Sequence, residues 1–246
     1  MKVLSVSTAT NHLSVALNED QTILVEKGEP DRHNHSEHLD PLINQILTDQ
    51  QLKLSEIDRF AVAIGPGSYT GLRIGVTTVK LFASILGKEV VGISTLAALA
   101  ASCPDEDTLI VTGIDARNDN YFAGAYVNGK GQPSRVIADG HYHITTLLEA
   151  IGRYVNTERI KQVIFIGSGF KKQEGQIKQL GLPFRYGSDD QNLIHAGLIG
   201  KLALTAQPVD PDRLLPQYLR RTQAEVDWHH KTGQPYGPDK DYVEEV

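Results

Sequence analysis

The residues with the clearest chemical potential form a glycine-rich segment, GPGSYTGLRIG at positions 65–75. A turn of this kind between a strand and a helix can present backbone N–H groups to a phosphate. A P-loop would require Lys and then Ser or Thr after its last glycine, but Leu72 follows Gly71. A dinucleotide-binding loop would require a third glycine where Thr70 stands. The segment therefore matches neither nucleotide-binding motif.

The glycines of this segment have a spacing that suits a helix. Gly67, Gly71 and Gly75 recur every four residues and Val79 continues the row, so on a helix they share one face. Glycine inside a helix is less stable than alanine by about 0.5–1 kcal/mol, so the stripe needs a packing reason. Two alternatives are open: packing against the protein's own sheet, or a helix–helix interface with a partner protein.

Three histidines, His33, His35 and His38, lie close together at the expected start of a helix. Such a cluster raises the possibility of a metal site. No two of them are four residues apart, although a pair three apart can still ligate a metal. We favour a solvated helix start over a metal site. With Asn44, His35 and His38 occupy outer positions of this helix, which together with the glycine-bearing helix would offer a dimerisation face.

The alternation of apolar and polar residues predicts one order of elements that occurs twice: three strands, helix, strand, helix, strand, helix. The first round has expected strands at 2–8, 12–17, 22–26, 58–64 and 89–93, and helices at 36–49 and 69–86 and after Ser94. The second has expected strands at 108–114, 121–127, 135–138, 162–166 and 183–186, and helices at 144–155, 171–180 and 192–206. Meanders give antiparallel pairs and strand–helix–strand units give parallel ones, so each half is a mixed five-stranded sheet with helices.

This pattern predicts an α/β fold of two ribonuclease-H-like lobes, the actin/hexokinase/Hsp70-like architecture. We expect an N-terminal lobe at 1–104, a C-terminal lobe at 105–221 and a flexible tail at 222–246.

Phosphotransfer enzymes of this architecture carry an Asp at the end of the first strand to hold the metal-bound phosphate or its attacking water. Here that position is Ser7, whose hydroxyl supplies no charge for Mg²⁺. Asp115, in the second half, could be offered as a substitute, but an ordinary turn residue explains it equally well.

The composition narrows the classes of function. Lys and Arg number 24 against 30 Asp and Glu, a net charge of −6, which argues against a protein that holds nucleic acid by itself. The single cysteine, Cys103, excludes an internal disulfide and an all-cysteine metal site. Neither a signal peptide nor a run of about 20 apolar residues is present, so we expect a cytoplasmic protein without a membrane partner.

Several segments in a fixed order resemble one family. They are VLSVSTATNHLSVAL (3–17), HSEHLDPLI (35–43), GPGSYTGLRIG (65–75), GISTLAALA (92–100), IDARNDNYFAGAY (114–126) and PQYLRR (216–221). Over nearly all of residues 1–221 the chain resembles the TsaB (YeaZ) family, the dimerisation subunit of the bacterial machinery that makes threonylcarbamoyladenosine (t6A) in tRNA. In that family the first strand usually ends in Asp-Thr-Ser-Thr. The present Ser-Thr-Ala-Thr at 7–10 weakens a residual nucleotide role and leaves a scaffold role untouched.

The resemblance implies a non-catalytic scaffold that binds a TsaD-type catalytic subunit and a TsaE-type ATPase, and that also forms a homodimer. The complex transfers threonylcarbamoyl to N6 of the adenosine 3′ of the anticodon in tRNAs that read codons starting with A. The chain would need no cofactor, because ATP and a metal belong to the partner subunits, and would reach tRNA only indirectly. The implied interface residues are His35, His38, Leu39, Leu42, Ile46, Gly67, Tyr69, Gly71, Leu72, Gly75 and Val79.

Two other functions compete with the scaffold. The duplicated lobes and glycine turns would also suit an actin-like-fold kinase or ATPase, which tight binding and turnover of Mg²⁺–ATP would reveal. The histidine cluster would suit a glycopeptidase-like metalloprotein, which would carry stoichiometric zinc or iron. The missing Asp and the unmatched phosphate motifs favour the scaffold.

Overall fold

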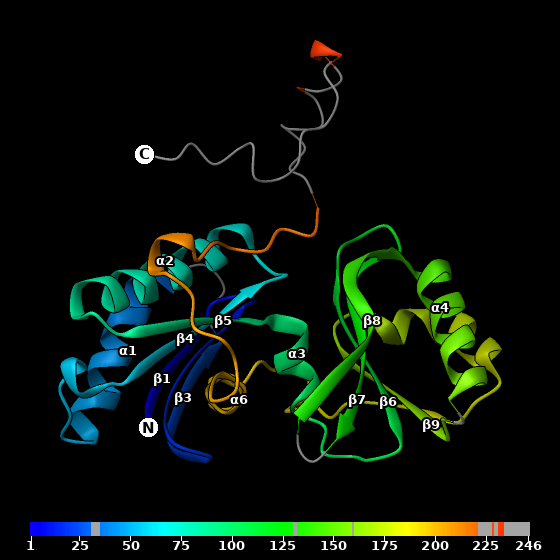
Figure 1. Ribbon diagram of the computed structural model, residues 1–246. Coiled ribbons are helices and arrows are strands. Elements are labelled where there is room, and N and C mark those ends of the chain that lie inside the picture. Colours follow the sequence, from blue (N-terminus) through cyan, green and yellow to red (C-terminus); the bar gives the residue numbers. More distant parts are fainter. Residues whose placement is uncertain (31–34, 130–131, 159, 221–227, 229–230, 234–246) are drawn as a thin grey trace.

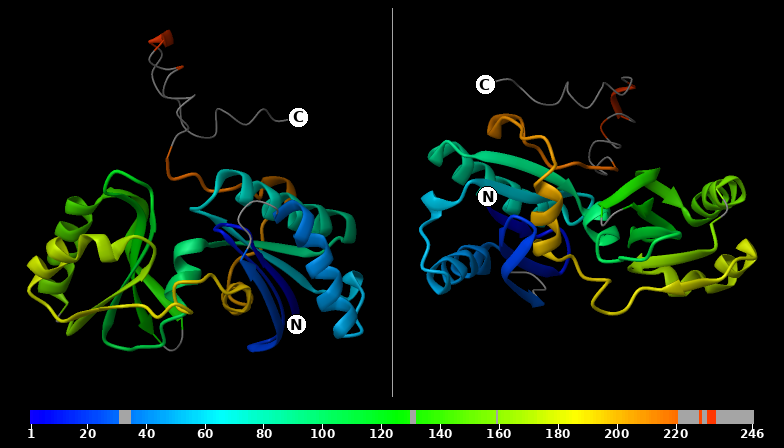
Figure 2. Two further views of the ribbon diagram at one scale, coloured as in Figure 1. Left: turned by 180° about the vertical axis from the view of Figure 1, so that it is seen from behind. Right: turned by 60° about the horizontal axis from the view of Figure 1, so that its bottom comes forward.

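The structure is a computed structural model, and it describes residues 1–30, 35–129, 132–158, 160–220, 228 and 231–233. Most of the expected tail at 222–246 lies outside the described residues, as does His33. Figure 1 shows two lobes side by side, each a sheet with helices, and Figure 2 shows the same division from two further sides. Within the described residues, no helix combines the length and the apolar character needed to cross a membrane.

The first lobe contains a mixed five-stranded sheet in the order β3-β2-β1-β4-β5. Its strands are β1 (Lys2–Ser7), β2 (His12–Glu19), β3 (Thr22–Pro30), β4 (Arg59–Gly65) and β5 (Glu89–Ser94). The meander β1 to β3 is antiparallel, whereas β4 pairs parallel to both β1 and β5. Helices α1 (His35–Asp49) and α2 (Tyr69–Leu86) cover one face, and a 3₁₀ turn η1 (Leu54–Glu56) precedes β4. The expected topology of this half is confirmed.

The second lobe repeats this arrangement with the order β10-β9-β6-β7-β8. Its strands are β6 (Thr108–Asp115), β7 (Asn120–Gly129), β8 (Gln132–His143), β9 (Gln162–Gly167) and β10 (Phe184–Tyr186). Helix α4 (Ile144–Thr157) covers the outer face. The helix expected at 171–180 is present as one continuous helical run, but only its middle part is α-helical: η2 (Phe170–Gln173), α5 (Glu174–Ile177) and η3 (Lys178–Leu180) follow one another directly. Gly169 and Gly181 adopt positive φ at the two ends of this run.

Helix α2 begins and ends at residues suited to those positions. The Ser68 hydroxyl accepts a hydrogen bond from the Gly71 N–H at 3.2 Å, as an N-cap does. Gly87 adopts the left-handed conformation at the other end, with φ of 61°. These two local signals explain why the expected and observed bounds of the helix coincide.

The last α-helix before the C-terminal segment packs on the first lobe and not on the second. α6 (Ala196–Ala203) lies on the first sheet, on the face opposite α1 and α2. Its glycines allow this close approach: a Cβ on Gly200 would lie 2.5 Å from the Asn18 amide oxygen, and the Asn18 amide donates to the Gly197 carbonyl at 2.9 Å. The second lobe as expected, 105–221, is therefore wrong at its C-terminal end. From α6 onward the chain packs on the first lobe, including the buried Leu214.

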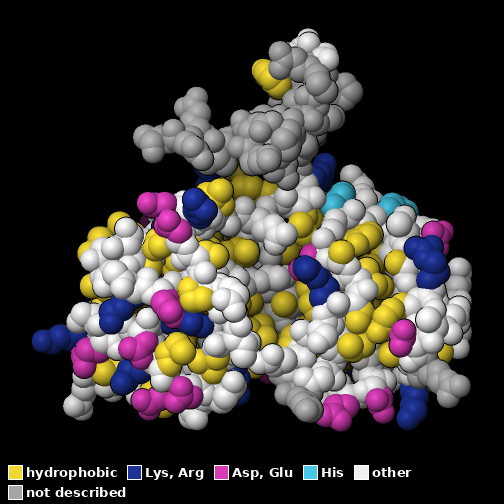
Figure 3. Space-filling view, viewed as in Figure 1, with side chains coloured by type: hydrophobic (Ala, Val, Ile, Leu, Met, Phe, Trp, Pro, Cys, Tyr) yellow, Lys and Arg dark blue, Asp and Glu magenta, His cyan; other side chains and the backbone are white. Residues whose placement is uncertain are grey.

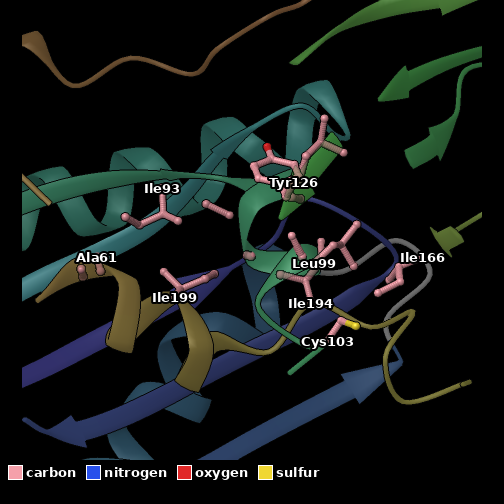
Figure 4. Packing of buried hydrophobic residues seen from close by; sticks show 14 of the residues in the cluster. Ala61, Ile93, Leu99, Cys103, Tyr126, Ile166, Ile194 and Ile199 are labelled. Atoms are coloured by element: carbon pink, nitrogen blue, oxygen red, sulfur yellow. The ribbon is translucent and has the colours of Figure 1, made fainter. Parts of the chain in front are cut away.

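An apolar core joins the two lobes. Helix α3 (Thr95–Ala100) links the sheets, and its Leu99 packs with Ile93 from the first sheet, Tyr126 and Ile166 from the second, and residues on and beside α6. Figure 4 shows these side chains converging between the lobes, with Cys103 beside them. Because this core is continuous, the lobes form one folded unit.

Candidate functional site

The glycine-rich turn between β4 and α2 packs against the end of β1. The Ser68 N–H donates to the Ala9 carbonyl at 2.7 Å. A Cβ on Gly67 would lie 2.3 Å from the Ala9 carbonyl oxygen. A Cβ on Gly71 would lie 2.1 Å from the Thr8 carbonyl oxygen, and one on Gly75 would lie 2.4 Å from the Thr8 hydroxyl. The glycine stripe therefore serves internal packing, the first of the two alternatives, and does not face a partner.

The other side of the turn is closed by the C-terminal segment. The Gln217 N–H donates to the Ile64 carbonyl at 2.7 Å. Gly65, with φ of +130°, leaves room for the Gln217 carbonyl oxygen, which would lie 2.4 Å from a Cβ at that position. Residues of the chain itself thus contact the turn from two sides. These contacts account for the glycines of the turn without a phosphate ligand.

Ser7 stands at the end of β1, where phosphotransfer enzymes of this architecture carry an Asp. Ser7 is fully buried, and its hydroxyl has no hydrogen-bond partner. In the second lobe, Asp115 forms an ion pair with Lys172 at 2.9 Å and accepts a hydrogen bond from the Arg117 N–H at 2.8 Å. The Lys172 bond is the main cause that lowers the pKa of Asp115. Asp115 therefore organises the turn before β7.

The described histidines of the N-terminal cluster point to different groups. Nε2 of His35 lies 2.8 Å from the Thr10 carbonyl oxygen, and Nδ1 of His38 lies 2.9 Å from Glu29. Across the part of the chain that the structure describes, no three His, Cys, Asp or Glu side chains are arranged to hold a metal ion.

Many of the expected interface residues lie in the core of the first lobe. The buried ones are Leu39, Leu42, Ile46, Gly71, Leu72, Gly75 and Val79. They pack between α1, α2 and the sheet, because a helix buries its apolar face first against its own sheet. Burial within the chain already accounts for these residues, and their part in a partner interface stays a prediction. His38 and Tyr69 are exposed and stay available.

The free surface of α1 and α2 instead consists of two shallow grooves. One lies between the helices and is lined by residues including Asp40, Arg73 and Ile74. The other lies farther along α1 and is lined by residues including Leu52 and Phe82. Two large apolar side chains of α2 also stand in solvent: Leu81 is 53% exposed and Ile85 is 71% exposed. Exposed apolar side chains next to a groove are typical of a protein–protein contact.

Residues from the C-terminal segment complete the surface at the start of α2. The Tyr69 and Tyr218 rings stack with centroids 4.9 Å apart, and Nε of Arg73 donates to the Tyr218 hydroxyl at 3.1 Å. Sequence reasoning missed Tyr218, although it lies in the segment PQYLRR that carries part of the family resemblance. Nothing in the local pattern indicates that it meets α2.

A buried carboxylate between the lobes was also missed. Asp139 on β8 accepts hydrogen bonds from the Ser94 hydroxyl at 2.6 Å and the Tyr126 hydroxyl at 2.5 Å, and its side chain is 1% exposed. Burial, followed by the charge of Asp139, raises the pKa of Tyr126. Because Ser94 belongs to the first sheet, Asp139 ties the lobes together.

Comparison with known proteins gives the family. A family model described as TsaD, tRNA N6-adenosine threonylcarbamoyltransferase, matches residues 29–185. The chain is 30% identical over 229 residues to the tRNA threonylcarbamoyladenosine biosynthesis protein TsaB of Bacillus subtilis, which covers 93% of this chain and 98% of that protein. The chain belongs to the TsaB family. The Escherichia coli TsaB is 29% identical over 195 residues, covering 76% of this chain and 80% of that protein.

Solved structures agree with this membership. YeaZ from Pseudomonas aeruginosa, at 25% identity, superposes on this TsaB-family chain with a TM-score of 0.71 and covers 89% of this chain and 99% of that one. A ROK hexokinase from Thermus thermophilus superposes with a TM-score of 0.51 at 11% identity, covering 83% of this chain and 100% of that one. The likeness to the hexokinase is one of fold alone, and it supports the expected actin-like two-lobe architecture.

Proposed function

We propose that this chain takes part in t6A biosynthesis as a non-catalytic scaffold for a TsaD-type catalytic subunit. The names of its Bacillus and Escherichia relatives, tRNA threonylcarbamoyladenosine biosynthesis proteins, support the pathway. In this proposal the partner subunits transfer threonylcarbamoyl to N6 of the adenosine 3′ of the anticodon in tRNAs that read codons starting with A. ATP and metal are bound by the catalytic subunit and a TsaE-type ATPase, and this chain carries no cofactor.

One observation carries the non-catalytic role: the glycine-rich turn is filled by the chain's own residues. Thr8 and Ala9 contact it on one side and Gln217 on the other. A phosphate-binding turn holds its ligand with backbone N–H groups, and here the Ser68 N–H already donates to Ala9 and the Gly71 N–H to the Ser68 hydroxyl. Ser7 at the end of β1 adds no charge for a metal-bound phosphate. These features argue against the kinase or ATPase alternative.

The α1–α2 surface is our candidate for the partner contact. It offers two grooves and the exposed Leu81 and Ile85 on adjacent helices that run in the same direction. A matching helix pair on the catalytic subunit, or on a second copy of this chain, would bury these side chains in a four-helix bundle. The same surface would then serve both the heterodimer and the homodimer, which would exclude each other.

Reconstitution tests the proposal. The catalytic subunit, the ATPase, the threonylcarbamoyl donor and unmodified tRNA are mixed with or without this chain, and t6A is measured by mass spectrometry of the digested tRNA. We expect no product from the chain alone and full activity only when it is added to its partners. Equal activity without the chain would refute the scaffold role.

Two further measurements address the alternatives. Calorimetry of the isolated chain with Mg²⁺–ATP is expected to give no binding heat, and tight binding with turnover would instead support the kinase. Metal analysis of the purified chain is expected to find less than stoichiometric zinc or iron. A tightly held equivalent of either metal would revive the metalloprotein.

A further inference from the structure

An aromatic and cationic cluster forms where α2 meets the C-terminal segment. Tyr69 at the start of α2 and Tyr218 stack with their rings tilted by 23°. The Arg73 guanidinium lies 4.5 Å from the centre of the Tyr69 ring, and its Nε donates to the Tyr218 hydroxyl. Two segments distant in sequence thus hold three large side chains in one arrangement.

These side chains are fixed but not buried. Tyr69 is 45% exposed, Tyr218 is 40% exposed, and Arg73 is also exposed. The segment that carries Tyr218 is held on the first lobe, because Leu214 is buried in its core and the Gln217 N–H donates to the Ile64 carbonyl. An ordered pair of aromatic rings in solvent is prepared for a ligand, since little conformational freedom remains to be lost on binding.

Cations continue from this cluster along the same segment. Lys80, two turns after Arg73, donates to the Asp212 carbonyl at 3.0 Å, while Arg213 and Arg220 are exposed on the segment itself. Within the described chain, none of the four has a carboxylate within 4.0 Å, so no ion pair neutralises them. Asp210 and Asp212 are the carboxylates of the segment, and Asp210 caps a 3₁₀ turn, η4 (Pro211–Arg213).

The cationic strip reaches the second lobe. The charge of Arg220 lies close enough to His141 on β8 to lower the pKa of that histidine, an effect second to burial. Figure 3 shows hydrophobic side chains along the upper edge of the first lobe, with Lys and Arg side chains to both sides of them. An edge with an excess of unpaired cations is notable in a chain with a net charge of −6.

We propose that this edge binds RNA: Lys80, Arg213 and Arg220 contact phosphates, an unpaired base stacks on the Tyr69–Tyr218 pair, and Arg73 holds the two rings in place. Aromatic faces flanked by Arg and Lys are the usual means of holding single-stranded nucleic acid, because every base can stack and every phosphate attracts a cation. The proposal rests on the proposed function, which supplies tRNA as the RNA. It makes this chain a direct, auxiliary tRNA contact, where the sequence suggested only an indirect one.

The test uses the complex with the catalytic subunit and the ATPase, and an unmodified tRNA transcript as the probe. Fluorescence anisotropy gives the affinity for tRNA, and sedimentation of the same samples gives the affinity between subunits. Tyr218→Ala is expected to weaken tRNA binding about fivefold or more, while Tyr218→Phe keeps the ring and most of the binding. Arg220→Glu is expected to weaken binding and to reduce the slope of log affinity against log salt by about 1.

Two control variants separate the proposal from simpler effects. Leu215→Ala removes an apolar side chain, 48% exposed, from the same segment and is expected to leave tRNA binding unchanged. Arg153→Glu makes the same charge change on the far helix α4, where Arg153 is exposed, and is expected to have a much smaller effect than Arg220→Glu.

Three outcomes would overturn the proposal. Unchanged tRNA affinity in Tyr218→Ala would remove the stacking contact. Equal losses of tRNA affinity in Arg220→Glu and Arg153→Glu would show that only the net charge of the chain matters. Dissociation of the subunits by Tyr218→Ala would make this edge a protein contact. Failure of the proposed function is distinct, since the unmodified chain would then not join the complex at all.

Discussion

The hydroxyl of Thr8 donates to the carbonyl oxygen of Gly71 at 2.6 Å. This bond ties the loop after β1 to the first turn of α2, while the Gly71 Cα lies directly against the Thr8 backbone. The contact packs the glycine-rich turn against the chain's own backbone. A motif rich in glycine is used here to close a turn, and its glycines are needed for stability.

Gly71→Ala is therefore expected to destabilise the folded chain. The added Cβ would lie 2.1 Å from the Thr8 carbonyl oxygen, which is backbone and cannot turn aside. Overpacking of this kind costs about 1–3 kcal/mol. Gly152→Ala is the matched control, because Gly152 also lies in a helix but has nothing within 4 Å of its Cβ position. That variant is expected to gain about 0.5–1 kcal/mol. Urea unfolding measures both, and equal effects would contradict the account.

Arg59→Met is expected to loosen the attachment of α6 to the first sheet. The buried Arg59 side chain pairs with Glu89 at 2.6 Å and donates to the Ala203 carbonyl at 2.5 Å, at the end of α6. Loss of these charged hydrogen bonds is expected to lower the free energy of unfolding by about 1.5–3 kcal/mol. Lys161→Met breaks an exposed ion pair with Asp107 and should change it by less than about 1 kcal/mol. Similar losses in the two variants would show that burial of the pair is unimportant.

His195 is expected to make stability fall at alkaline pH. Its ring lies beside Glu26 on β3, and the hydrogen bond to Glu26 is the main cause that raises the pKa of His195 to about 9. Because the folded-state pKa lies above the ordinary value of 6.5, this stabilisation is complete below pH 6.5 and is lost as the pH rises through about 9. The slope is at most about 1.4 kcal/mol per pH unit. In His195→Gln the decline between these pH values should be absent, and an identical pH profile would contradict the assignment.

Ile85→Asp is expected to abolish binding to the catalytic subunit without unfolding the chain. Ile85 is 71% exposed, so a carboxylate there remains hydrated in the free chain but would be buried without a partner in the proposed helix bundle. Sedimentation of the mixed subunits measures binding, and thermal unfolding measures stability. Leu24→Asp is the control, because Leu24 is 39% exposed on β3, away from the α1–α2 surface. Equal binding by both variants and the unmodified chain would exclude this surface.

The sequence predicts the elements well where local signals are strong. The repeated order of strands and helices follows from apolar periodicity, and α2 has the expected bounds because Ser68 and Gly87 are suited to its two ends. The helix expected at 171–180 has nearly the observed bounds, but its outer turns are 3₁₀ and not α, which its residue types do not reveal. Periodicity thus predicts the position of a helical segment more firmly than its type of turn.

Long-range contacts could not be predicted in the same way. The apolar face of α6 indicates that it packs on a sheet, but not that the sheet belongs to the other lobe. The glycine stripe allowed a partner or the chain itself as its neighbour, and only the structure places Thr8 there. Tyr218 and Asp139 likewise gain their roles from residues far away in sequence.

The position of α6 has a consequence for how the protein is made. The strands of the first sheet are complete at Ser94, but the helix that covers one of its faces is residues 196–203. At the usual 5–20 residues per second, translation leaves this apolar face unprotected for roughly 5–20 s. The N-terminal half alone is therefore a poor choice for expression. The first lobe, although its strands are made first, is completed only after the second lobe has been made.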